Sequence, residues 1–121
     1  MIDLTKVKTI AVIGASNNPA KFGNKIIKDL LKKDFIVWPV NPKEDLIEGQ
    51  KVYHSLADLP ALPDMINLVV PAEIGFNIVK QAIDLGVKNI WLQPGAQSDE
   101  IIDYIKKFPD VNFVQNSCTM M

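Results

Sequence analysis

The stretch Val7-Lys8-Thr9-Ile10-Ala11-Val12-Ile13-Gly14-Ala15-Ser16-Asn17-Asn18-Pro19 decides the fold of this chain. Residues 7–13 form a short, continuous, β-branched run, which predicts a strand buried on both faces. At Gly14 a glycine lets the backbone turn tightly and approach a ligand closely. A helix that follows such a turn points its unsatisfied N–H groups at the turn. The stretch is therefore typical of a loop that binds a phosphate group.

The rest of the chain alternates between predicted strands and predicted helices. Further strands are expected at residues 35–40, 65–70, 87–92 and 111–114, and helices at residues 23–33, 72–85 and 98–107, with Ser98 as a cap. The stretch 43–64 is less regular, with a brief strand pairing at 52–53 and a capped helical turn at 55–59. The helix 72–85 is expected to end at Gly86 and to turn one apolar stripe inward: Ile74, Ile78, Val79, Ala82 and Ile83.

This alternation predicts right-handed βαβ units in an α/β, doubly wound, Rossmann-like fold. We expect one domain over residues 1–121, with three αβα layers around a parallel five-stranded sheet in the order 3-2-1-4-5. In such a sheet the ligand binds beyond the carboxyl ends of the strands, at the switch point, here between strands one and four. Four segments would then surround one crevice: residues 14–18, 41–42, 70–71 and 93–95.

Composition and charge exclude several classes of partner. The net charge of −1 argues against a broad nucleic-acid surface. No apolar stretch approaches the length of about 18 residues that a membrane span needs. The N-terminus lacks the charged and apolar regions of a signal peptide, and the single cysteine, Cys118, excludes an internal disulfide. We therefore expect a cytoplasmic protein without nucleic-acid or membrane partners.

The loop after the first strand departs from the dinucleotide pattern. A Gly-x-Gly-x-x-Gly fingerprint needs a second glycine where this chain has Ser16, and the next glycine is Gly23. An NAD site also needs an acidic residue at the end of the second strand, where the chain has Asn41. Both departures disfavour an NAD(P)-dependent oxidoreductase, which stays open as an alternative together with a nucleotide-sensing regulatory domain.

Five segments together resemble a known family. They are residues 11–19, residues 40–42, residues 52–60, the run Trp91-Leu92-Gln93-Pro94-Gly95, and Cys118. Their order along the chain is that of the small bacterial and archaeal CoA-binding proteins that consist of a lone Rossmann-type CoA-binding domain. The fold also looks like the N-terminal domain of the succinyl-CoA synthetase α subunit. That enzyme uses a phosphorylated histidine from a second domain, and this chain has no matching histidine.

The resemblance implies that coenzyme A, or an acyl-CoA, is the cofactor. By that likeness CoA lies over Gly14, Ala15, Ser16 and Asn17, then over Asn41 and Pro42, then over Leu92, Gln93 and Pro94. The chemistry of CoA adds further candidates: Lys21, Lys25 and Lys43 for phosphate charge, and Val70, Pro71 and Gly95 for adenine or pantetheine.

The function expected from the sequence is therefore binding of CoA or an acyl-CoA through a Gly-Ala-Ser phosphate loop, with no evident catalytic group and no metal site. The partner is a small molecule, together with an unidentified protein that uses the loaded module; the sequence does not give the oligomeric state. Trp91 and Tyr53 are interpreted as packing residues, and His54 as a loop residue without a catalytic role. Gly14→Val is expected to abolish CoA binding in a protein that still folds, and Cys118 to form a mixed disulfide with CoA.

Overall fold

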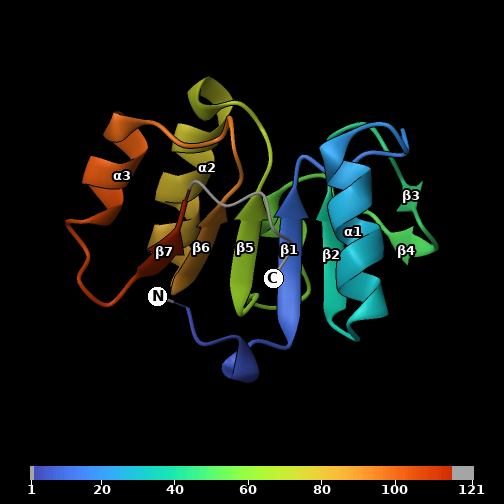
Figure 1. Cartoon of the computed structure of the whole chain (residues 1–121), viewed down its shortest axis with the longest axis horizontal. Coiled ribbons are helices and arrows are strands. Elements are labelled where there is room, and N and C mark those ends of the chain that lie inside the picture. The colour runs from blue at the N-terminus through green and yellow to red at the C-terminus, as the bar shows by residue number, and fades with distance from the viewer. Residues whose placement is uncertain (1, 116–121) are drawn as a thin grey trace.

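The computed structural model describes residues 2–115, so the expectation for Cys118 lies outside the described residues. A parallel sheet of five strands forms the centre (Figure 1). The strands of this sheet are β1 (Thr9–Ile13), β2 (Ile36–Val40), β5 (Met65–Leu68), β6 (Asn89–Leu92) and β7 (Asn112–Val114). The helices are α1 (Phe22–Lys32), α2 (Ala72–Leu85) and α3 (Asp99–Ile105). The expected α/β, Rossmann-like, three-layer fold is confirmed.

The expected strand order is wrong. The sheet runs β2-β1-β5-β6-β7, so the third strand of the sheet pairs with the first and not with the second. Ile10 of β1 pairs with Met65 of β5 on one side, and with Val37 of β2 on the other. In order of sequence the five strands therefore lie 2-1-3-4-5, the second common order of doubly wound sheets.

The path from β2 to β5 explains this order. Helix α1 carries the chain from β1 to β2 across one face of the sheet. The following connection returns over the other face, where Leu56 packs in the same cluster as Val79 of α2. Crossovers between parallel strands are right-handed. Two successive crossovers on opposite faces of the sheet therefore add their strands in opposite directions along the sheet. The second crossover thus places β5 beyond β1.

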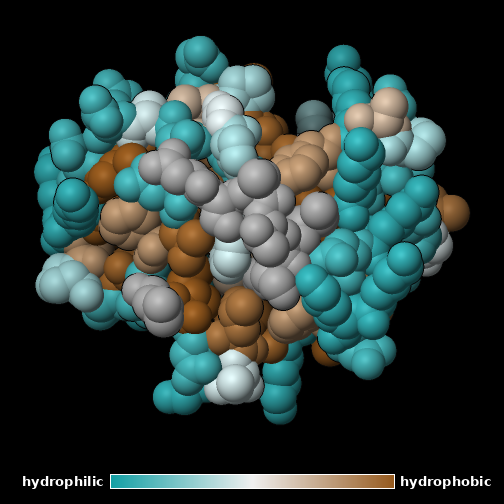
Figure 2. Space-filling model, in the orientation of Figure 1, coloured by the Kyte–Doolittle hydropathy of each residue, from teal (hydrophilic) through white to brown (hydrophobic). Residues whose placement is uncertain are grey.

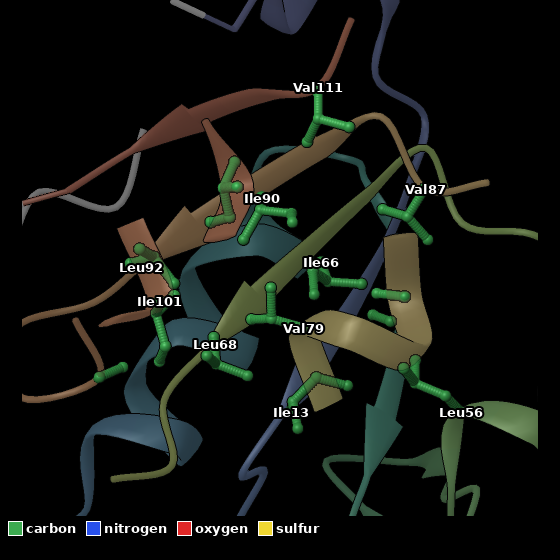
Figure 3. Packing of buried hydrophobic residues seen from close by; sticks show 14 of the residues in the cluster. Ile13, Leu56, Ile66, Leu68, Val79, Val87, Ile90, Leu92, Ile101 and Val111 are labelled. Carbon is green, nitrogen blue, oxygen red and sulfur yellow. The ribbon is translucent and has the colours of Figure 1, made fainter. Parts of the chain in front are cut away.

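Each face of the sheet has its own core. On one face Ala11 and Ile13 of β1 pack with residues of α2 and α3 (Figure 3). On the other face Ile10 and Val12 pack with the inward residues of α1. All four residues of β5 are buried, as expected for a central parallel strand covered on both sides. The outer surface around α1 is hydrophilic (Figure 2), which matches the amphipathic pattern of that helix.

The irregular connection between β2 and β5 contains a short antiparallel hairpin. Its strands are β3 (Leu46–Ile47) and β4 (Gln50–Lys51), joined by a turn at Glu48 and Gly49, both at positive φ. The expected brief pairing is present as a bridge between Val40 and Tyr53. The expected helical turn is the 3-10 helix η2 (Leu56–Asp58), and a second 3-10 helix, η1 (Leu4–Lys6), precedes β1.

The helix boundaries follow the local signals in the sequence. Ser98 caps α3 by accepting a hydrogen bond from the N–H of Ile101, and Gly86 ends α2 in the left-handed conformation. Ile74 differs from its expected position, because its side chain is 57% exposed instead of packing in the core. Among the described residues, no helix combines the length and apolarity needed to cross a membrane.

Candidate functional site

A cavity of about 420 Å³ opens at the carboxyl end of the sheet, next to β1, β2 and β5. With the observed strand order, the chain leaves β1 toward β2 and leaves β5 toward β6, so the switch point lies between β1 and β5. The cavity is lined by Ile13, Gly14, Ala15, Ser16, Lys21, Val40, Asn41, Pro42, His54, Ser55, Leu56, Val70, Ile74, Ile78 and Gln81. It therefore lies where this class of fold binds its ligand.

Seven of the fourteen residues predicted for the site line this cavity. They are Gly14, Ala15, Ser16, Lys21, Asn41, Pro42 and Val70. The other seven do not line it: Asn17, Lys25, Pro71, Leu92, Gln93, Pro94 and Gly95. The structure thus brings together the loop after β1 and the turn after β2, and leaves the loop after β6 outside this cavity.

Gly14 sets the course of the loop after β1. Its φ of +100° lies in the region that favours glycine, and the N–H groups of Gly14 and Ala15 both donate to the carbonyl of Val40 at 3.3 Å. A Cβ on Gly14 would lie 3.1 Å from the backbone nitrogen of Val70. The expectation that Gly14→Val leaves a folded protein stays a prediction, and these contacts add that the variant should be less stable than the wild type, because the added side chain would press on the backbone that follows β5.

The first turn of α1 packs directly on this loop. A Cβ on Gly23 would overlap the carbonyl oxygen of Gly14, so only glycine permits the helix to come this close. Lys21 is the N-cap residue of α1 and provides no side-chain hydrogen bond, so Ser16 does not cap the helix. The hydroxyl of Ser16 instead accepts from the N–H of Asn18 at 3.0 Å. The first turn of α1 therefore keeps N–H groups without a side-chain acceptor.

Three asparagines fix the loop to its surroundings. Asn41 donates from Nδ2 to the carbonyl of Ala15 at 2.8 Å, and its Oδ1 accepts from the N–H of Lys43 at 2.7 Å. Asn17 donates to Glu44 and to the carbonyl of Leu46, and the buried Asn24 donates to the carbonyl of Ser16 and to Glu48. Both ends of the Asn41 amide are thus occupied where a dinucleotide site needs a free carboxylate.

Sequence reasoning missed eight residues of the cavity wall. Ile13 and Val40 are the last residues of β1 and β2, and the other six are His54, Ser55, Leu56, Ile74, Ile78 and Gln81. Of these six, His54 and Ser55 precede η2 and Leu56 is its first residue, and the observed crossover brings this stretch beside α2. The other three lie along one side of α2, at positions i, i+4 and i+7. The spacing of the two isoleucines predicts core packing. Ile78 does pack against the core, and both side chains also form part of the cavity wall.

The loop after β6 has a structural role in its first half. Gln93 is fully buried and donates from Nε2 to Oδ1 of the buried Asn67 at 2.9 Å. Leu92 is also fully buried, whereas Pro94 and Gly95 are exposed. The indole of Trp91 is 7% exposed and packs in the core on the α1 side, which confirms the interpretation of Trp91 as a packing residue.

Two groups bring positive charge to the cavity wall among the described residues, namely Lys21 and, when protonated, His54. Nε2 of His54 lies 3.1 Å from the carbonyl oxygen of Glu44 and 3.1 Å from Oδ1 of Asp45. Within residues 2–115 no three His, Cys, Asp or Glu side chains lie close enough together to hold a metal ion. The ammonium group of Lys21 gives this wall a positive charge that suits an anionic ligand.

The fold and the cavity define a nucleotide-binding domain of the Rossmann-like class. Comparison with known proteins is more specific. The family model described as "CoA binding domain" matches residues 8–121. The chain therefore belongs to this CoA-binding family, and coenzyme A is the cofactor that the family assigns, as the sequence predicted.

Individual relatives agree with this assignment. The ADP-forming acetate–CoA ligase II of Archaeoglobus fulgidus is 35% identical over 100 residues, covering 81% of this chain and 15% of the ligase. A conserved hypothetical protein from Pyrococcus furiosus is 48% identical with a TM-score of 0.86, covering 93% of this chain and 97% of that one. The dinucleotide-forming acetyl-coenzyme A synthetase 1 of Ca. Korarchaeum cryptofilum, in complex with phosphate and ADP, is 26% identical with a TM-score of 0.78, covering 93% of this chain and 27% of that one. The chain thus spans a small part of the ligase and the synthetase, and most of the Pyrococcus protein.

Proposed function

We propose that this chain binds CoA or an acyl-CoA at the carboxyl end of β1 and β5, and that it supplies binding without a catalytic group of its own. The observation that carries the proposal is the junction of the Gly14 loop with the cavity at the switch point. The family match supports CoA as the ligand, and the cavity supports this end of the sheet as its position.

The diphosphate of CoA would lie against the backbone of residues 14–17 and the first turn of α1. Three features support this position: the close approach that Gly14 and Gly23 permit, the N–H groups of the first turn, and the ammonium group of Lys21. Lys25 and Lys43 are exposed and lie close in sequence to the same loop, so their positive charge would act on the ligand from outside the cavity.

The pantetheine arm would leave the diphosphate toward residues 92–95. Pro94 and Gly95 are exposed at the same carboxyl end of the sheet, and Pro71 is exposed at the start of α2. The side chains of Leu92 and Gln93 are buried, so we expect the backbone of this loop, rather than those side chains, to contact the arm.

A binding role is supported by the chemistry of the cavity wall. Its hydroxyl groups belong to Ser16 and Ser55, which lie on different segments of the wall, and the imidazole of His54 faces a backbone carbonyl and Asp45. The ligase relatives are several times longer than this chain, which agrees with a module that presents CoA to other protein domains. Such a domain would be the protein partner expected from the sequence.

Isothermal titration calorimetry with CoA, NAD and ATP tests the proposal. CoA should bind with the highest affinity, because the occupied amide of Asn41 cannot accept the ribose hydroxyls of NAD. A ligand that binds the folded state alone also raises the unfolding temperature, so a thermal-shift series gives an independent measurement. An NAD affinity equal to or higher than that for CoA would contradict the proposal and favour the oxidoreductase alternative.

A further inference from the structure

Helix α1 presents a row of lysines to the solvent. The N-cap residue Lys21 is followed by Lys25, Lys28 and Lys32, a spacing that places all four on one side of the helix. All four residues are exposed, whereas the opposite side of α1 is buried in the core against the sheet. Figure 2 shows the hydrophilic surface over this helix. Lys21, Lys25, Lys28 and Lys32 are called the lysine row below.

Acidic side chains do not neutralise the lysine row. No ion pair among residues 2–115 includes a lysine of the row. The acidic residue on the same helix, Asp29, pairs with Lys33 at 2.9 Å. The carboxylates of Glu44 and Glu48, in the connection after β2, accept hydrogen bonds from asparagine side chains instead. Residues 21–33 contain five lysines and one aspartate, a net charge of +4 in a chain whose total charge is −1.

One end of the lysine row lies at the candidate site. Lys21 lines the cavity, and the first turn of α1 packs on the Gly14 loop. Because an α-helix rises about 1.5 Å per residue, the distance along α1 from Lys21 to Lys32 is about 16 Å. The positive end of the helix dipole lies at the Lys21 end. A strip of positive charge therefore follows α1 along the side of the sheet to the proposed position of the diphosphate (Figure 1).

The chemistry of CoA suits such a strip. CoA is strongly anionic, because its 3′-phosphate and its diphosphate are ionised at neutral pH. Clustered charges of one sign attract a ligand of opposite charge before contact and raise its association rate. Resting on the proposed function, we infer that the lysine row is an electrostatic approach surface that guides CoA and its thioesters to the Gly14 loop. Lys28 and Lys32 accelerate binding in this way without contacting the bound ligand.

Ionic strength distinguishes this long-range attraction from a direct contact. Salt screens the field of a charge over about 10 Å at 0.1 M and over about 30 Å at 0.01 M. The charge of Lys32, at the far end of the row, therefore acts on a ligand at the Gly14 loop only in dilute buffer. An ion pair with the bound ligand would instead slow its dissociation. The approach surface consequently changes the association rate and leaves the dissociation rate as it is.

Stopped-flow fluorescence measures both rates. The probes are the fluorescent etheno-adenine derivatives of CoA and of dephospho-CoA, which lacks the 3′-phosphate and its charge. The variant is Lys28→Gln/Lys32→Gln. The matched control is Lys6→Gln/Lys106→Gln, which removes the same charge from two exposed lysines outside α1. All four substitutions are on the surface, so both variants are expected to fold, and circular dichroism checks this.

In buffer of about 0.01 M ionic strength, Lys28→Gln/Lys32→Gln should lower the association rate constant of the CoA probe by about threefold to fivefold. Its dissociation rate constant should not change. The effect should disappear at about 0.5 M salt and should be smaller for the dephospho-CoA probe, which carries less negative charge. The control variant should slow association by less than half as much as the Lys28→Gln/Lys32→Gln variant.

Other outcomes overturn the inference in distinct ways. If the variant binds the CoA probe at the wild-type rate in dilute buffer, the row does not guide the ligand, while the proposed function stands. Faster dissociation from the variant would mean that Lys28 or Lys32 contacts bound CoA. Equal slowing by the control would mean that total charge, and not the row, sets the rate. If the wild-type chain binds neither probe, the proposed function fails as well.

Discussion

Two loops at the carboxyl end of the sheet contain a glycine in nearly the same conformation. Gly14, after β1, has a φ of +100°, and Gly95, after β6, has a φ of +91°. A Cβ on Gly14 would be pressed against Val69 and Val70, whereas a Cβ on Gly95 would meet no atom within 4 Å. The loop after β1 is thus packed between two neighbouring segments, and the tip of the loop after β6 is open. Glycine at positive φ therefore does not by itself indicate how tightly a loop is held.

The largest change in stability is expected for substitution of Gly14, and it should exceed the change for Gly95. Gly14→Val combines a strained φ with a contact against the backbone of Val70, just beyond β5, so we expect it to lower the free energy of unfolding by about 3–4 kcal/mol. Gly95→Val has the strain alone and should lower it by about 1–2 kcal/mol. Urea denaturation of the two variants measures the difference. Equal losses would mean that packing does not distinguish the loops.

Asn41→Leu tests how the loop after β1 is held. The substitution removes the hydrogen bond to the carbonyl of Ala15 and the acceptor for the N–H of Lys43, and should lower the free energy of unfolding by about 2 kcal/mol. CoA affinity should fall as well, because the same bonds align the loop with the turn after β2.

Asn41→Asp is the matched control for this experiment. It keeps the acceptor for the N–H of Lys43, but its second oxygen replaces the Nδ2 donor and would face the carbonyl of Ala15. We therefore expect the carboxylate to disturb the loop after β1 and the variant not to bind NAD. Measurable NAD binding by this variant would show that Asn41 alone excludes the dinucleotide.

The loop after β6 is tested through its buried amides. Gln93→Leu leaves Oδ1 of Asn67 without its donor and should lower the free energy of unfolding by about 1–2 kcal/mol. The double variant Asn67→Leu/Gln93→Leu should recover part of this loss, because both polar partners are replaced by apolar groups. Chemical denaturation of the single and double variants measures the coupling. If the double variant loses more free energy of unfolding than the two single variants lose together, a purely structural role of the pair is contradicted.

The smallest effect is expected at the opposite end of the sheet, far from both loops. The N–H of Lys8 donates to the carboxylate of Asp64 and is the main reason that the pKa of Asp64 lies below its ordinary value, with a smaller contribution from Thr9. Because the pKa of Asp64 is lower in the folded state than in the unfolded state, its charge stabilises the fold at pH values above the pKa of the unfolded state. This contribution is lost as the pH falls through the pKa of the folded state. Asp64→Asn should therefore lower the free energy of unfolding by about 1 kcal/mol at pH 7. The variant should also lose less stability than the wild type when the pH is lowered below about 4. CoA affinity at neutral pH should not change, and a change would mean that the two ends of the sheet are coupled.

Local signals in the sequence predicted the elements well, because each is set by neighbouring residues. The helix 72–85 was predicted with its boundaries, and Gly86 and Ser98 act as the sequence indicated. Strand order depends on which face a connection crosses, and the irregular stretch 43–64 has no periodic pattern that reveals its face. Pro39 is a local signal that agrees with the observed order, since a proline favours an edge position for the second strand.

The sequence predicted those parts of the candidate site that directly follow the end of β1 or β2. Gly14, Ala15, Ser16, Asn41 and Pro42 follow β1 and β2 directly, and all line the cavity. His54 and Gln81 reach it through the crossover and through the position of α2 above the sheet, which depend on the whole topology. Ile74 illustrates the limit, because an apolar side chain at helical spacing predicts burial and does not distinguish a core position from a position at a cavity wall.

Pro39 also has a consequence for the behaviour of the molecule in concentrated solution. Strand β2 lies at the edge of the sheet, and its Pro39 carbonyl already accepts the N–H of Tyr53 at 2.9 Å. A residue directs its N–H and C=O to the same side of a strand, so the donor that proline lacks is missing from this outward side. An incoming strand would find neither a donor nor a free acceptor at this position. The β2 edge is thereby protected against strand addition, the contact through which exposed sheet edges aggregate.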